Sequence, residues 1–203
     1  MHLALGNKLY SSWSLRPWIL MRALGIPFEE TVIAMYREDT RARMLEYGPT
    51  GKVPVLTDGD AVLTDSTAIL TWLADRHHQL THPAGTIERA HQDALLHCVL
   101  DEVDAVLWTA ARHSFVLPEE RRVPAVKDSL KWELSRNLDR MAARFEGPFV
   151  MGATMTIADI VLTHCLNWAH NAKFEITSER LLAYGKEMRG RAAFRRVVAL
   201  GAR

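Results

Sequence analysis

The sequence predicts a mixed α/β domain at the N-terminus, followed by an all-helical domain. Over residues 1–80, short apolar and β-branched runs alternate with helical patterns, whereas strand signals are absent from the later part of the chain. Between the two lies "THPAGT" (81–86), whose proline and glycine break helices and are typical of a linker. We therefore expect one domain over 1–80 and a helical one over 87–203.

The elements of the first domain follow from local patterns. Gly25 and Pro27 end the first helix, and Asp58-Gly59 between two apolar runs is a strong hairpin signal. In order, we expect a buried strand at 3–6, a helix at 15–24, a β-branched strand at 28–34, a polar helix at 39–46, a hairpin at 53–64 and a helix at 65–77. The order β-α-β-α-β-β-α implies a mixed sheet flanked by helices.

Long helical patterns make up the second domain. They cover 87–113, 124–146 and the strongly apolar 156–170, which we expect to be central and buried. Thr156 and Asp159 have the spacing of a reciprocal helix cap. The two cysteines, Cys98 and Cys165, lie within apolar helical patterns, which favours core packing over catalysis.

Composition excludes several functional classes. A net charge of +1 over 203 residues provides no field for binding nucleic acid or an anionic membrane. No apolar run approaches the ~20 residues of a membrane span, and "MHLALGN" lacks the features of a signal peptide. Two cysteines do not suggest a disulfide framework, and no cluster suggests a metal site. We expect a cytoplasmic protein.

The stretch "NKLYSSWSLRPW" places three serines at the start of the first helix. Proline is harmless only in a helix's first turn, so Pro17 favours Ser14 as the N-cap. Ser11 and Ser12 then lie in the preceding turn, beside helix N–H groups that favour an anion.

A second motif, "GPTGKVPVL", puts Pro54 at the start of a strand, where proline is unusual. The main chain of Val53 could pair with an extended ligand. Eleven residues after Pro54, Asp65 and Ser66 open the next helix, where Ser66 could bind a carboxylate and Asp65 an ammonium group.

With "LTDSTAIL" and "TIADI", these motifs make nearly the whole chain resemble the cytosolic glutathione S-transferases. The serine-rich first motif is most similar to serine-type enzymes of the zeta class and its bacterial relatives. The resemblance implies a thioredoxin-like N-terminal domain that binds glutathione and an all-helical C-terminal domain that contributes the electrophile pocket.

The resemblance also implies roles for individual residues. Ser11, with Ser12 as the alternative, would hold the glutathione sulfur as a thiolate. The expected glutathione-binding residues are Lys52 for the glycyl carboxylate, Val53 and a cis Pro54 for the cysteinyl unit, and Asp65 and Ser66 for the γ-glutamyl group. Trp13, Trp108 and Arg112 are expected in the electrophile pocket.

The activity implied is attack of a glutathione thiolate on a small hydrophobic electrophile, as in detoxification. The partners implied are glutathione as co-substrate and a second copy of the chain in a homodimer, without metal. One alternative is a zeta-type glutathione-dependent isomerase of maleylacetoacetate-like substrates. Trp13 argues against it, because zeta enzymes carry cysteine there. Another is a non-catalytic binding protein with the transferase fold.

Overall fold

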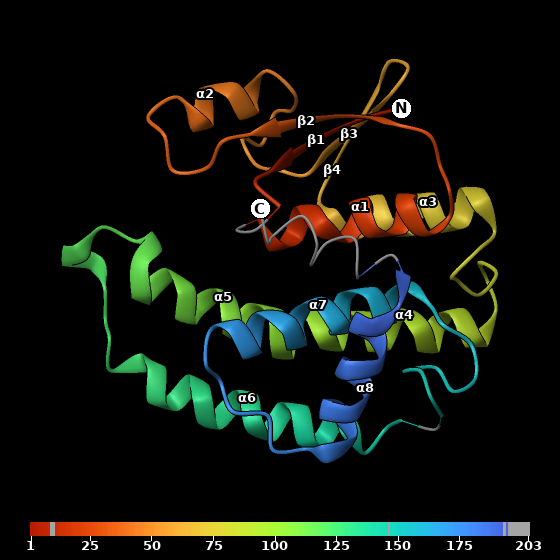
Figure 1. Cartoon of the computed structure of the whole chain (residues 1–203), viewed down its shortest axis with the longest axis vertical. Coiled ribbons are helices and arrows are strands. Elements are labelled where there is room, and N and C mark those ends of the chain that lie inside the picture. The colour runs from red at the N-terminus through yellow and green to blue at the C-terminus, as the bar shows by residue number, and fades with distance from the viewer. Residues whose placement is uncertain (9–10, 146, 193, 195–203) are drawn as a thin grey trace. The chain divides into compact units, whose positions relative to one another are not determined.

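The computed structural model describes residues 1–8, 11–145, 147–192 and 194 (Figure 1). The chain forms two compact units. The first comprises Met1–Thr81 and the segment that begins at Arg189, and the second comprises His82–Met188. The helical domain expected over 87–203 includes that last segment, whereas in the structure it groups with the first unit. No helix within the described residues is long and apolar enough to cross a membrane.

A four-stranded mixed sheet forms the centre of the first unit, with strand order β2-β1-β3-β4. β1 pairs in parallel with β2 and antiparallel with β3, and β3 pairs antiparallel with β4. The strands are β1 (His2–Gly6), β2 (Glu29–Ile33), β3 (Val55–Asp58) and β4 (Ala61–Thr64). The predicted order of elements is confirmed. The hairpin turns at Gly59, whose φ of +59° suits a residue without a side chain.

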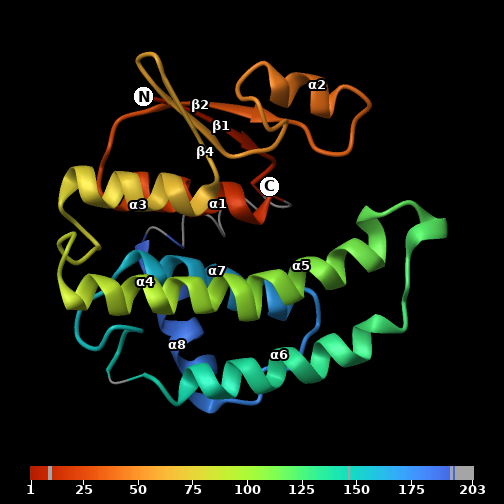
Figure 2. The ribbon, with the colours of Figure 1, turned by 180° about the vertical axis from the view of Figure 1, so that it is seen from behind.

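Three helices accompany the sheet: α1 (Ser12–Ala23), α2 (Thr40–Leu45) and α3 (Ser66–His77). In both views α1 and α3 lie side by side along one face (Figures 1 and 2). Met44 of α2 packs in a buried cluster with Ala4, Ile33 and Val55 of the strands. Leu5, the neighbour of Ala4, is also fully buried and points to the opposite face. The sheet is therefore covered on both faces, which is the expected thioredoxin-like arrangement.

Glu30 links β2 to α1 and to the segment that precedes it. Its carboxylate accepts a hydrogen bond of 2.7 Å from the indole Nε1 of Trp18 and pairs with Lys8, whose ammonium group lies 5.0 Å from the centre of the Trp18 ring. Partial burial alone would raise the pKa of Glu30, but the hydrogen bonds from Lys8 and Trp18 outweigh it and hold that pKa below its ordinary value.

The second unit begins with a long helical stretch that contains two π-helical segments. In order it consists of α4 (Ile87–Val99), η1 (Leu100–Asp104), α5 (Ala105–Ala111) and η2 (Arg112–Val116). The amide of Asn137 donates to the main-chain oxygen of Glu102 in η1 at 2.8 Å, and Arg140 donates to the Glu102 carboxylate at 3.0 Å. The sequence predicts a long helical pattern over 87–113, and the structure shows that it includes π turns, one of which is bonded to a neighbouring helix.

The helices that complete this part of the chain are α6 (Val126–Ala142), α7 (Ile157–Asn171) and α8 (Glu179–Gly190). The prediction that α7 is buried and capped is confirmed, because Thr156 and Asp159 form the reciprocal cap. Asp159 also accepts hydrogen bonds of 2.9 Å from the Val150 N–H and the Tyr184 hydroxyl. Burial raises the pKa of Asp159, although these hydrogen bonds favour the ionised form.

Candidate functional site

The motifs singled out from the sequence meet at one edge of the sheet. Because β1 runs antiparallel to β3, the end of β1 at Gly6 lies at the same edge as the start of β3 at Val55. β4 runs antiparallel to β3, with Thr64 opposite Val55, so the chain leaves β4 for α3 at that edge too. Val53 and Pro54 directly precede β3, so they enter the sheet at this edge.

At this edge the serines of the first motif form a buried hydrogen-bonded group. The Oγ atoms of Ser11 and Ser14 lie 2.7 Å apart, and the N–H of Gly6 donates to Ser14 Oγ at 3.1 Å. Ser14 is fully buried and Ser11 is 5% exposed, whereas Ser12 is half-buried. Ser11 and Ser14 are thus buried partners of each other, and Ser12 is the most exposed of the three.

The prediction that Ser14 caps α1 is wrong. The helix begins at Ser12 with Ser11 as the N-cap residue, and no side chain makes a capping hydrogen bond there. Ser14 does not cap because its hydroxyl turns back to Gly6 and Ser11. Pro17 consequently lies inside the helix and lacks the N–H that would bond to the preceding turn.

Gly6 allows this close approach between the end of β1 and Ser11. A Cβ atom added at Gly6 would lie 2.6 Å from the Cβ and 2.8 Å from the Oγ of Ser11. Such separations are shorter than van der Waals contact, so any larger residue would displace Ser11. The position of the serine hydroxyl therefore depends on glycine at the end of the strand.

The second half of the site is the N-terminus of α3. Asp65 is exposed, and its Oδ1 accepts the N–H groups of Thr67 and Ala68 at 2.9 and 3.0 Å. Its φ of +72° is a strained conformation for a residue with a side chain, and such strain is concentrated at functional sites. Ser66 is buried, and its Oγ accepts a hydrogen bond of 3.3 Å from Nη1 of Arg16.

Sequence reasoning missed Arg16. It is 1% exposed and lies in the run Ser14–Met21, all of whose residues are buried. Arginine is almost never fully buried unless it is paired. The sequence did contain a signal for a buried charge, namely a cationic residue within an apolar helical run. It could not indicate Ser66 as a partner, because Ser66 lies on another helix.

The other predicted glutathione-binding residues lie just before β3. The peptide bond between Val53 and Pro54 is cis, the isomer that the family resemblance implies. Pro54 is buried, Val53 is half-buried and Lys52 is exposed.

The three residues expected in an electrophile pocket belong to different units. Trp13 lies in the first turn of α1, whereas Trp108 lies in α5 and Arg112 begins η2 of the second unit. The second unit contains a cavity of about 540 Å³ whose charged and imidazole lining groups come from His113, Glu119, Arg122 and Lys127. None of the three predicted residues lines it.

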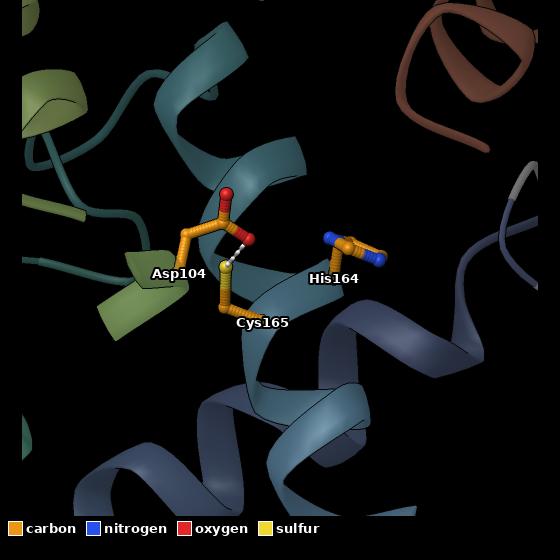
Figure 3. A group of neighbouring side chains, drawn as sticks. All are labelled: Asp104, His164 and Cys165. Atoms are coloured by element: carbon orange, nitrogen blue, oxygen red, sulfur yellow. Dashed lines mark hydrogen bonds between the residues drawn. The ribbon is translucent and has the colours of Figure 1, made fainter. Parts of the chain in front are cut away.

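One group among the described residues, Asp104, His164 and Cys165, could hold a metal ion (Figure 3). All three are buried, their ligand atoms lie within 4.8 Å of one another, and the Cys165 thiol donates to Asp104 Oδ1 at 3.6 Å. Tetrahedral zinc, with bonds of about 2.0–2.3 Å, holds its ligand atoms closer together, roughly 3.3–3.8 Å apart. The arrangement is thus a buried hydrogen-bonded group that would have to contract around an ion.

The other cysteine, Cys98, is half-buried, and its sulfur accepts a contact of 3.6 Å from Nη1 of Arg144. Burial, followed by the nearby Glu102 carboxylate, raises the pKa of the Cys98 thiol. Raising the pKa lowers the thiolate fraction, so this cysteine is not an activated nucleophile.

Comparison with known proteins matches residues 10–76 to the N-terminal domain of glutathione S-transferase. The chain is 30% identical over 171 residues to glutathione S-transferase theta-2 of Rattus norvegicus, covering 79% of this chain and 69% of that protein. It is 27% identical over 165 residues to the zeta class glutathione S-transferase of Euphorbia esula, covering 76% and 72%. Both theta and zeta classes thus occur among its relatives.

Solved structures of glutathione transferases superpose on nearly the whole chain. A glutathione transferase from Methylococcus capsulatus superposes with a TM-score of 0.82 at 29% identity, over 99% of this chain and 100% of that one. BphK, a bacterial glutathione S-transferase solved as a ternary complex, gives a TM-score of 0.83 at 25% identity over the same shares.

Proposed function

The chain belongs to the glutathione S-transferase family, and from that premise we propose that Ser11 holds the glutathione sulfur as a thiolate. The protein is a glutathione transferase. The names of its relatives do not say which group activates the thiol. The observation that carries our assignment is the short hydrogen bond between the buried hydroxyls of Ser11 and Ser14.

Either hydroxyl could donate in that hydrogen bond, and we propose that Ser14 donates to Ser11. A serine hydroxyl has one hydrogen to donate, and its oxygen can accept from other groups. Because Ser14 Oγ accepts the N–H of Gly6, its own hydrogen is available to Ser11 Oγ. Ser11 then directs its hydrogen outward, toward the sulfur. A chain of hydrogen bonds that all run in one direction polarises each member and favours an anion at its end.

The energetics of this arrangement are sufficient for thiol activation. A free thiol with a pKa of about 8.5 is only a few per cent ionised near neutral pH. Lowering that pKa by about 2 units takes roughly 2.7 kcal/mol of preferential stabilisation of the thiolate. A hydrogen bond to a charged group supplies about 1.5–3 kcal/mol, and a helix N-terminus about 0.3–1 kcal/mol more. One serine at the start of α1 is therefore enough.

The rest of glutathione would follow the sheet edge away from Ser11. The main chain of Val53 would pair with the cysteinyl unit beside Pro54. Asp65 and Ser66 would bind the ammonium and carboxylate of the γ-glutamyl group at the N-terminus of α3. The exposed Lys52 would bind the glycyl carboxylate.

The thiolate would attack an electrophilic carbon of a small hydrophobic substrate. We further propose a detoxifying role and a cytoplasmic homodimer. The two free cysteines support a reducing compartment. The zeta-type isomerase remains the second candidate, supported by the 29% identity over 92 residues to a probable maleylacetoacetate isomerase of Caenorhabditis elegans. Trp13 in place of the zeta cysteine argues against it.

The test is retention of the purified protein on immobilised glutathione, followed by turnover of an aryl halide and of maleylacetoacetate. Retention with aryl halide turnover is the expected result. Retention without turnover of either substrate would favour a binding protein, and turnover that survives Ser11→Ala without loss would contradict the assignment of Ser11.

A further inference from the structure

The second unit has a cavity that the proposed function does not use. Its volume is about 540 Å³, and it lies where η2, η3 (Glu119–Arg121) and the first turn of α6 follow the end of α5 (Figure 1). Sites for small molecules typically have volumes of roughly 300–1,000 Å³. All the residues that line the cavity belong to the second unit, whereas those we assign to glutathione belong to the first.

A guanidinium group is held in place at the wall of this cavity. Arg122 lines it and donates from Nε to the main-chain oxygen of Leu117 at 2.7 Å, and from Nη2 to that of Phe115 at 3.2 Å. These two bonds fix the plane of the guanidinium, while its outer N–H groups, including those of Nη1, can donate to a ligand. A fixed guanidinium is well suited to binding a carboxylate, because their planar geometries match.

The start of α6 adds further positive charge. Lys127, in the first turn of that helix, lines the cavity and is exposed. The neighbouring Asp128 carboxylate pairs with Lys131, at 3.3 Å, and not with Lys127. The N-terminus of a helix carries a partial positive charge of its own. The only opposing charge that the lining contributes is the carboxylate of Glu119, so the lining is cationic on balance.

The imidazole of His113 supplies a third donor. Its Nδ1 accepts the N–H of Val123 at 3.2 Å, so a neutral His113 ring carries its hydrogen on Nε2. The hydrogen bond therefore selects the tautomer in which the other ring nitrogen donates. The rest of the lining is mainly apolar and includes Ala110, Pro124 and Val126.

We propose that this cavity is a binding site for a small organic anion, a carboxylate carried on an apolar body. The carboxylate accepts hydrogen bonds from Arg122, Lys127 and the Nε2–H of His113. The apolar body packs against the apolar part of the lining. This inference goes beyond the proposed function, because it concerns neither glutathione nor the thiolate.

The test is a cycle that changes the charge of the ligand and of the protein. The probes are para-phenylbenzoate and its neutral amide, para-phenylbenzamide, which have the same shape. The variants of the full chain are Lys127→Gln and Glu119→Gln, which remove opposite charges from the lining. Lys131→Gln is the matched control, because it removes the same charge as Lys127→Gln from the same helix, outside the lining. Binding constants are measured by calorimetry without glutathione.

The native protein should bind para-phenylbenzoate about tenfold more tightly than the amide, as expected for a charge-assisted hydrogen bond. Lys127→Gln should reduce this preference to less than about threefold, because Lys127 contributes both a donor and a charge. Glu119→Gln should increase the preference about two- to threefold, because it removes the opposing charge. Lys131→Gln should leave it unchanged. General loosening of the fold would not shift the preference in opposite directions.

Equal affinity of the native protein for the two probes would overturn the proposal. A preference that survives Lys127→Gln in full would also overturn it, because the anion would then be bound elsewhere in the protein. Equal losses in Lys127→Gln and Lys131→Gln would equally contradict it, since they would indicate attraction to the overall charge of α6 and not a built site.

Discussion

Replacement of Ser14 by alanine separates direct from relayed stabilisation of the thiolate. Ser14 is fully buried and lies between the Gly6 N–H, at 3.1 Å, and the Ser11 hydroxyl, at 2.7 Å. It therefore cannot touch the sulfur if Ser11 does. Ser14→Ala leaves Ser11 in place but removes the hydroxyl that orients and polarises it.

The size of the effect follows from the two hydrogen bonds. Direct loss of the Ser11 bond should cost about 1.5–3 kcal/mol, which raises the pKa of the bound glutathione thiol by about 1–2 units. Loss of the relay removes only the cooperative part, about 10–30% of that energy, or about 0.1–0.7 pKa units. Ser14→Ala also leaves the Gly6 N–H without its acceptor, at a cost of about 1–3 kcal/mol in the free energy of unfolding.

The assay is ultraviolet titration of the thiolate in the binary complex with glutathione, together with the pH dependence of kcat/KM. The expected order of pKa increase is Ser11→Ala, then Ser14→Ala, then Ser12→Ala, the last with no resolved change. A larger increase for Ser12→Ala than for Ser11→Ala would refute the assignment of Ser11. An increase for Ser14→Ala as large as that for Ser11→Ala would refute the relay.

Two further predictions concern the first unit. Gly6→Ala is expected to displace Ser11, because the new Cβ would lie 2.6 Å from the Cβ of Ser11. This displacement should lower kcat/KM at least tenfold. Gly190→Ala, which enters open space, is the control, and equal activity of the two variants would contradict the reasoning. Glu30, whose pKa is lowered, contributes stability above its ordinary pKa of 4.5 and loses it as the pH falls below that value. Thermal melting should therefore show Glu30→Gln less stable than the native protein at pH 7, with the gap narrowing as the pH falls below 4.5; a constant gap would contradict this.

Local signals were sufficient for much of the architecture. The Asp58-Gly59 turn places β3 and β4, and the Thr156–Asp159 cap starts α7, because each depends on residues a few positions apart. In the structure, strand pairing brings the ends of the segments that carry Val53 and Asp65 to one edge of the sheet.

Features that depend on distant partners could not be predicted in the same way. The position of Pro17 led to the wrong N-cap for α1, because Ser14 bonds to Gly6, eight residues away, instead of capping the helix. The buried Arg16 donates a hydrogen bond to Ser66, which lies fifty residues further along the chain. The π turns of η1 are contacted through Glu102 by Asn137, which lies on another helix. In each case a tertiary contact outweighs the local preference.

The π segment η1 allows the second unit to lose one residue without turning the rest of the helix. A π turn accommodates one residue more than an α-helical turn, while the α-helical turns on either side keep their orientation. Loss of one residue from Leu100–Asp104 would therefore restore regular winding and leave Trp108 and Arg112 on the same sides of their helix. A deletion within α4 or α5 would instead rotate every later residue of that helical stretch by about 100°.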